Sequence, residues 1–168
     1  MLTNNFYKIM LSLMTKPGQT IFPTKYDGTS SSPISDPRYL FEGLRYVKSG
    51  GFASGMYGTY FGTGTTPPTR ADYKLEAPIT SNALYSTATE APLVSYDEDH
   101  ARLYMTHEVH NAGTTDVTVT EMGVFGGASD TSKVIFLLDR TVLDTPITIP
   151  AGGSKSITVA IRFDYPEA

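Results

Sequence analysis

Hydrophobic and polar residues alternate most regularly near the end of the chain. The apolar positions, separated by Ser, Thr, Ala, Arg and Asp, are Ile157, Val159, Ile161, Phe163 and Tyr165. Successive side chains of a β-strand point to opposite faces, so this pattern predicts a strand with one buried face. Burying a large apolar side chain contributes roughly 1.5 to 3 kcal/mol, so this face supplies a major share of the core.

Further strand patterns precede this segment. Leu103, Met105, His107 and Val109 occupy alternate positions and should share one face. Residues 133–138 form a continuous apolar run, as in a strand covered on both faces. Other expected strands are 57–61, 82–87, 93–96 and 117–125, with loops at 97–100, 111–113 and 126–132 and a strand, turn and strand over 147–154. Many short strands separated by turns indicate an all-β protein, an antiparallel β-sandwich or jelly roll.

The N-terminus has the period of a helix instead. Thr3 is an acceptable N-cap, and Pro17-Gly18 is a stop signal. Between them one apolar stripe is formed by Phe6, Ile9, Met10, Leu13 and Met14. A helix of about three turns is marginal alone in water, so this stripe must pack on something. Two surfaces remain open, the chain's own domain and a neighbouring subunit.

Residues 16–40 favour an extended arm. They hold four prolines, Asp27-Gly28 and a Thr-Ser-Ser-Ser run, which disfavour regular structure. We therefore divide the chain into an N-terminal helix and extended arm, 1–42, and an antiparallel β-sandwich domain, 43–168. Because the expected strands all follow residue 43, we expect this domain to fold without residues 1–40. The helical stripe is then the expected contact with other subunits.

Composition and charge narrow the classes of function that this protein can have. Hydrophobic residues make up 40% and charged residues 18% of the chain, and the charged share is below the usual quarter. A net charge of −4, with 13 scattered Lys and Arg, argues against nucleic-acid binding. The chain has no Cys, which excludes disulfides and thiolate metal sites. No apolar run approaches the roughly 18 residues of a membrane span, so no membrane partner is expected.

Three motifs resemble chemical sites only in part. His107 and His110 are three apart on an expected strand, so they should point to opposite faces and cannot form a metalloprotease zinc site. The acidic turn 97–100 is too short for a calcium loop. The glycine-rich loop 62–66 lacks a following Lys and runs into two prolines, with a capping-box-like turn at 69–72. We expect no catalytic residue, no cofactor and no metal.

Glu121 needs a partner. In a regular strand it shares a face with Val119 and Phe125, and a carboxylate among apolar neighbours must be paired. Arg140 and Arg162 are the candidate partners in a structural ion pair. A contact between subunits is the other explanation.

Four stretches, taken together, resemble a group of small bacteriophage virion structural proteins. The matching segments are Leu2–Tyr7, Phe61–Thr69 with Asp72–Leu75, Val119–Gly126, and Leu138–Pro146 running into Ile149–Ser154. In that group a G-x-G-T-x-x-P turn precedes D-Y-x-L, a T-E-x-G-x-F-G strand follows, and the end reads L-x-R-x-V-L-D-x-P. The resemblance implies a virion part without catalytic residues, such as a capsid decoration, head fibre, neck or collar protein, or tail accessory.

The function expected from these features is a non-enzymatic structural component of a tailed-bacteriophage virion, assembled in the host cytoplasm. It would form a symmetric homo-oligomer on the head, neck or tail, with copies of itself and other virion proteins as partners. The alternative is a receptor- or carbohydrate-binding module that recognises a host-surface glycan. This alternative rests on the Gly- and Tyr-rich stretch 50–60, whose aromatic rings could stack on sugar faces.

Overall fold

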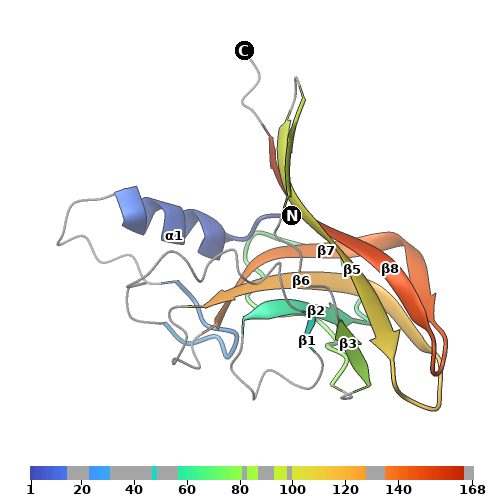
Figure 1. Ribbon diagram of the computed structural model, residues 1–168. Helices are drawn as coiled ribbons and strands as arrows, with labels where there is room; N and C mark the ends of the chain where they lie inside the picture. The colour runs from blue at the N-terminus through green and yellow to red at the C-terminus, as the bar shows by residue number, and fades with distance from the viewer. Residues whose placement is uncertain are drawn as a thin grey trace.

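The computed structural model describes residues 1–14, 23–30, 47–48, 57–80, 83–86, 93–97, 100–127 and 135–164. These residues form one helix and eight strands (Figure 1). In chain order they are α1 (Asn4–Met14), β1 (Val47–Lys48), β2 (Gly58–Gly62), β3 (Leu84–Ser86), β4 (Leu93–Tyr96), β5 (His100–Asn111), β6 (Val117–Gly127), β7 (Ile135–Ile149) and β8 (Ser154–Asp164).

The strands make two sheets. In the first sheet the order is β1-β2-β6-β7, antiparallel except for the parallel β1–β2 pair. In the second sheet β8 runs along one side of β5, while β3 and β4 pair with opposite ends of its other side. The main core takes buried residues from both sheets, among them Phe61, Val119, Val109 and Ile161. The expected all-β sandwich with a short N-terminal helix is confirmed.

Alternation located several strands correctly. β4 has the bounds expected from the sequence, and the expected inward face of β5 is buried at Met105, His107 and Val109. On β8, Ile157, Val159 and Ile161 are buried, and Phe163 is partly buried against the same core. Tyr165 lies outside the described residues.

β7 differs from the expectation. A loop was expected from Gly126, and a break before Ile147, but Gly126 and Gly127 continue β6, and β7 runs unbroken through Pro146. Gly127 lies so close to Tyr57 that a Cβ there would be 2.8 Å from its Cδ1. The β6–β7 register moves from Val119↔Ile147 to Glu121↔Val142. Pro146 falls in the unpaired interval, where its missing N–H removes no ladder bond.

The first half of β7 is covered on both faces, as its apolar run predicted. Ile135, Phe136, Leu137 and Leu138 are all 0% exposed. A second cluster covers the far side of the first sheet, and its buried members are Tyr60, Leu75, Phe125, Ile135 and Leu137. Val119 belongs to the main core and Phe125 to this second cluster, so the two do not share a face. The premise of a regular β6 was wrong, because of its register shifts.

The segment before the helix is attached to β7. Thr3 N donates to Leu138 O at 2.9 Å, and the Thr3 hydroxyl donates to Leu137 O at 2.6 Å. The Thr3 carbonyl accepts from Phe6 N at 3.1 Å, at the position expected for the N-cap. Its hydroxyl therefore anchors the helix to the sheet, where the sequence predicted a cap.

The helical stripe packs within its own chain. Phe6 is 6% and Ile9 1% exposed, and α1 packs against β7. The Phe6 ring centroid lies 5.5 Å from that of Phe163 on β8. Of the two surfaces left open, the chain's own domain covers Phe6 and Ile9, which corrects their expected role as subunit contacts. Met10 is half-buried, and the side chains of Leu13 and Met14 lie outside the described residues.

The described part of the expected arm is also bonded to the domain. Asn5 and Thr24 exchange two hydrogen bonds of 2.7 Å, between the Asn5 side chain and the Thr24 backbone. Tyr26 N donates to Ile135 O at 3.3 Å, and the Tyr26 ring packs on the second cluster. The boundary at residue 42 therefore does not separate residues 1–10 and 23–30 from the sandwich.

Candidate functional site

Four charged residues, two of them buried, gather where the first sheet meets the loop that follows β2. Arg140 lies on β7 and Glu121 on the neighbouring β6, and Glu121 pairs with Gly62 at the end of β2. The loop from Thr63 onward returns to β2 through a bridge between Gly62 and Pro78. This arrangement brings the loop carboxylates of Asp72 and Glu76 to Arg140. We call Asp72, Glu76, Glu121 and Arg140 the ion cluster.

Arg140 is the only cation of the ion cluster, and it faces all three of its carboxylates. Its Nε lies 2.9 Å from Glu121 Oε2, one terminal nitrogen 2.9 Å from Asp72 Oδ2, and the other 3.4 Å from Glu76 Oε2. Arg140 is 3% and Glu121 0% exposed. The structure thus brings Arg140 to Glu121, as expected. Arg162, the other candidate, is an exposed residue of β8 in the second sheet.

Glu121 also holds the loop backbone. Its Oε1 accepts from Ala77 N at 2.8 Å and Gly64 N at 3.3 Å, and its Oε2 accepts from Glu76 N at 3.2 Å. With the bond from Arg140, this buried carboxylate accepts four hydrogen bonds. Charge-assisted bonds of this kind compensate for the cost of burying an ionised group.

The two loop carboxylates fix the turns on either side of Pro67-Pro68. Asp72 accepts from Thr69 N at 3.0 Å, which is one half of a capping box, and from the Thr69 hydroxyl at 2.7 Å. Asp72 N donates to Thr69 O at 3.2 Å and not to the hydroxyl, so the motif closes a turn. Glu76 accepts from the backbone N of Thr65 and of Thr66, both at 2.9 Å, and from the Thr66 hydroxyl at 2.7 Å. The loop conformation therefore depends on charged groups at both ends.

These contacts shift the pKa values of Asp72, Glu76 and Arg140. Burial raises the pKa of Asp72, but hydrogen bonds from Thr69 and Arg140 outweigh it, and the pKa lies below its usual value. Hydrogen bonds from Thr66 and Thr65 likewise hold the pKa of Glu76 low. Burial would lower the pKa of Arg140, but bonds to Asp72 and Glu121 raise it overall. Asp72, Glu76 and Arg140 are thus charged at neutral pH.

The glycines of this loop have a steric role. A Cβ on Gly64 would lie 2.7 Å from Glu121 Cδ and 2.7 Å from Glu76 Cβ. Gly62 also contacts the Glu121 side chain closely, and Thr120 Oγ1 donates to Gly64 O at 2.9 Å. The glycine spacing that resembled a phosphate loop lets backbone approach a buried carboxylate instead.

A pocket of about 340 Å³ opens beside the ion cluster, lined by Thr66, Pro67, Asp72, Tyr73, Leu75 and Arg140. General acid–base catalysis works best when the pKa of the catalytic group lies near the operating pH. The lowered pKa values of Asp72 and Glu76 do not meet that condition. The groups of the ion cluster are occupied with each other and with the loop backbone, an arrangement suited to holding segments together.

The histidine motif is divided between two faces. His107 is fully buried, with its Nδ1 3.3 Å from the Ser86 hydroxyl. The His110 ring stacks on Tyr85, with centroids 5.0 Å apart. Across the turn after β4, His100 Nε2 lies 2.8 Å from Asp97 Oδ2, but without hydrogen-bond geometry. Among the described residues, no three His, Asp or Glu side chains group as a metal site requires.

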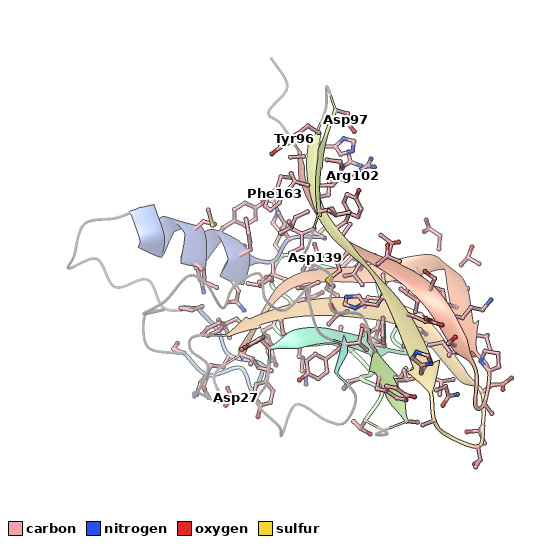
Figure 2. The ribbon with its side chains drawn as sticks, viewed as in Figure 1. Asp27, Tyr96, Asp97, Arg102, Asp139 and Phe163 are labelled. Carbon is pink, nitrogen blue, oxygen red and sulfur yellow. The ribbon has the colours of Figure 1, made fainter. Side chains whose placement is uncertain are left out.

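A second, larger hollow lies between α1 and the end of β8. It has a volume of about 660 Å³, and its lining includes Tyr7, Arg70, Asp139, Thr141, Arg162 and Phe163. The Arg70 guanidinium carbon lies 5.7 Å from the Tyr7 ring centroid. Figure 2 labels Asp139 and Phe163 on this side of the molecule. We call this hollow the aromatic groove.

The aromatic residues that suggested sugar stacking lie elsewhere. Tyr60 is 1% exposed within the second cluster, and Tyr57 packs against the same cluster. Tyr60 is buried and Tyr57 is partly buried, so neither is the exposed ring that sugar stacking would require. Residues 50–56 lie outside the described residues.

Sequence reasoning found Glu121 and Arg140 but missed Asp72 and Glu76 as their partners. The available signal was the D-Y-x-L motif following the glycine loop, which places both acids within one turn-rich segment. Comparison of the chain with protein-family models, curated proteins and solved structures gives no match. Within the part of the chain that the structure describes, no helix has the length and apolar character to cross a membrane.

Proposed function

We propose that this chain is a non-enzymatic structural component of a tailed-bacteriophage virion, acting as a symmetric oligomer on the head, neck or tail. The observation that carries the proposal is the convergence of the resembling segments. Three of the four stretches that resemble small virion proteins contribute to the ion cluster and its steric surroundings.

The convergence can be followed residue by residue. The G-x-G-T turn supplies Gly62 and Gly64, which let the loop approach Glu121. The D-Y-x-L segment supplies Asp72 to the ion cluster and Leu75 to the second cluster. The T-E-x-G-x-F-G strand supplies Glu121 and Gly123. The L-x-R segment supplies Arg140.

Gly123, like Gly64, lies where neighbouring side chains leave no room for a Cβ. A Cβ on Gly123 would lie 2.7 Å from Leu75 Cδ2 and 3.0 Å from Leu137 Cδ1. The motifs therefore specify how a long loop is fixed to a sheet. A signature made of loop-fixing residues suits a scaffold protein, since a catalytic signature would leave reactive groups exposed to a substrate.

The ion cluster itself supports the same proposal. Arg140 joins segments distant in sequence through a buried pair with Glu121 and a partly buried pair with Asp72, in a chain that has no cysteine. A subunit of a particle that persists outside the cell needs such cross-links, because its fold must survive without chaperones or replacement.

Quantitative mass spectrometry of purified phage particles tests the proposal. We expect the chain to co-purify with the particles at a fixed ratio to the major capsid protein, and to be located by cryo-EM at symmetry-related positions. Recovery of the chain only in the particle-free lysate would refute the virion role.

Binding of an acidic glycan is the second candidate function, and the aromatic groove favours it. Tyr7 is 43% exposed there, and Arg70 and Arg162 are exposed basic residues lining the same groove. Aromatic rings stack on sugar faces, and arginines bind carboxylates. A glycan array with the isolated protein tests it, with Tyr7→Ala and Arg70→Ala as loss-of-binding variants and Tyr85→Ala, an exposed tyrosine outside the groove, as control.

A further inference from the structure

An extension of the second sheet carries exposed apolar side chains. It consists of β4, the His100 end of β5 and the Asp164 end of β8, and it projects away from the sandwich (Figure 1). On β4, Leu93 is 55%, Val94 53% and Tyr96 74% exposed. Figure 2 shows Tyr96, with Asp97 and Arg102, near the end of this extension. Consecutive strand residues face opposite sides, so β4 is apolar and exposed on both of its faces.

β4 is also an edge strand. It pairs with β5 through Leu93↔Tyr104 to Tyr96↔Ala101, and no other strand of the described residues pairs with it. Edge strands present backbone donors and acceptors that template another strand, and monomeric proteins protect them with charges, prolines or bulges. The sequence Leu-Val-Ser-Tyr of β4 has none of these. An extended backbone is the occupant that satisfies both the edge and the two apolar faces.

We infer that β4 is the contact between two copies of this chain, which pair antiparallel along their β4 edges about a two-fold axis. A two-fold axis keeps each side chain on its face of the sheet, so one residue must stand opposite its own copy: the register we infer places Ser95 opposite Ser95 of the partner and Val94 opposite Tyr96 of the partner. All of these side chains are uncharged, so the strand meets itself without like-charge repulsion, which directly opposed charges would cause. An isologous contact of this kind requires such self-complementarity.

One acidic residue beside the strand is paired within its own chain. The side chains of Asp97 and Arg102 are each 47% exposed, and they approach each other to 3.9 Å within one chain. A stable interface buries about 800 Å² on each partner, more than four strand residues provide, so we expect a weak dimer that depends on concentration. This contact deepens the proposed virion role, because a symmetric particle part needs a contact between copies.

Sedimentation equilibrium of the full chain from about 10 µM to about 1 mM tests the contact, a range suited to a weak dimer. Wild type should shift from monomer toward dimer. Tyr96→Lys and Val94→Lys should weaken the dimer at least about tenfold, whereas Tyr85→Lys, the same change on the exposed tyrosine of β3, should not. Thermal melting of each variant checks its fold. A strictly monomeric wild type, or equal dimerisation of Tyr96→Lys and Tyr85→Lys, would overturn the inference.

The register has its own test, because the chain has no cysteine. Ser95→Cys alone should give a covalent dimer under mild oxidation, since its two cysteines would stand directly opposite each other. Val94→Cys alone should cross-link much less, because each Val94 faces Tyr96 and its own copy lies diagonally across the axis, beyond disulfide reach. Equal cross-linking of the two single variants would refute this register. Both experiments use free protein, so they can succeed even if the chain is absent from virions, and fail even if it is present.

Discussion

Replacing Glu121 with glutamine removes one charge and almost no volume from the ion cluster. In the wild type, Oε1 accepts from Gly64 N and Ala77 N, while Oε2 accepts from Glu76 N and Arg140 Nε. A glutamine has one oxygen and one NH₂ group. In either amide orientation, two of the four donors face the NH₂ group.

The expected cost follows from burial. Removing one partner of a buried ion pair costs about 3–5 kcal/mol, since the other charge is left uncompensated. Arg140 keeps Asp72 and Glu76, so we expect the lower end of this range, about 3 kcal/mol. For a chain of this size, 1 kcal/mol shifts the melting temperature by roughly 2–4 °C. Glu121→Gln should therefore melt about 6–12 °C below wild type.

Circular dichroism melts and urea titrations measure the effect. Glu108→Gln is the matched control: it alters an exposed residue of β5 whose carboxylate accepts from the Ser154 hydroxyl at 2.8 Å. Exposed charges contribute less than about 1 kcal/mol, so this variant should melt near wild type. If Glu121→Gln and Glu108→Gln melt together, the Glu121 carboxylate does not hold Arg140 and the loop backbone in place.

Three further predictions concern stability. Asp72 and Glu76 have lowered pKa values, so their stabilisation is complete above the ordinary carboxyl pKa and is lost as the pH falls through the folded-state values. The melting temperature should fall steeply below about pH 4.5, and a flat profile from about pH 6 to 3 would contradict this. Ile9→Ala should cost about 2–5 kcal/mol in urea unfolding, whereas an unchanged midpoint would indicate that the helix packs on another subunit. Gly64→Ala should destabilise by about 1–3 kcal/mol, because its methyl group would clash with Glu121, and a wild-type calorimetric melt would show that the loop can move.

The sequence predicted elements whose pattern reflects one buried face. β5 and β8 were recognised by alternation, because each has one face toward the core. Alternation did not predict the strand bounds where strand register or close packing, and not the burial of one face, determines the residue. Pro146 would ordinarily end a strand, yet it falls where β7 has no partner in register. In the sequence Gly127 suggests a loop. In the structure it belongs to β6, where the Tyr57 side chain leaves no room for a Cβ.

The site was half predictable for a similar reason. A carboxylate among apolar residues needs a partner, which identified Glu121 from the sequence, and Arg140 was one of its two candidate partners. Asp72 and Glu76 lie in a polar loop where charge is unremarkable, and only the return of this loop to β2 brings them to Arg140. The anchoring of α1 to β7 was equally invisible, because the Thr3 hydroxyl donates to Leu137, which lies 134 positions away.

The ion cluster also has a consequence for the rate at which the fold opens. Arg140 is separated from Glu121 by 19 positions and from Asp72 by 68. Asp72 reaches Arg140 only when the loop after β2 has returned to the sheet, so we expect the complete ion cluster to form late, after β2, β6 and β7 have paired. An interaction that forms after the transition state stabilises the native state without accelerating folding. The ion cluster should therefore act as a latch, slowing unfolding and leaving the folding rate almost unchanged. For a protein without disulfides, slow unfolding preserves the native fold for longer than its equilibrium stability alone would ensure.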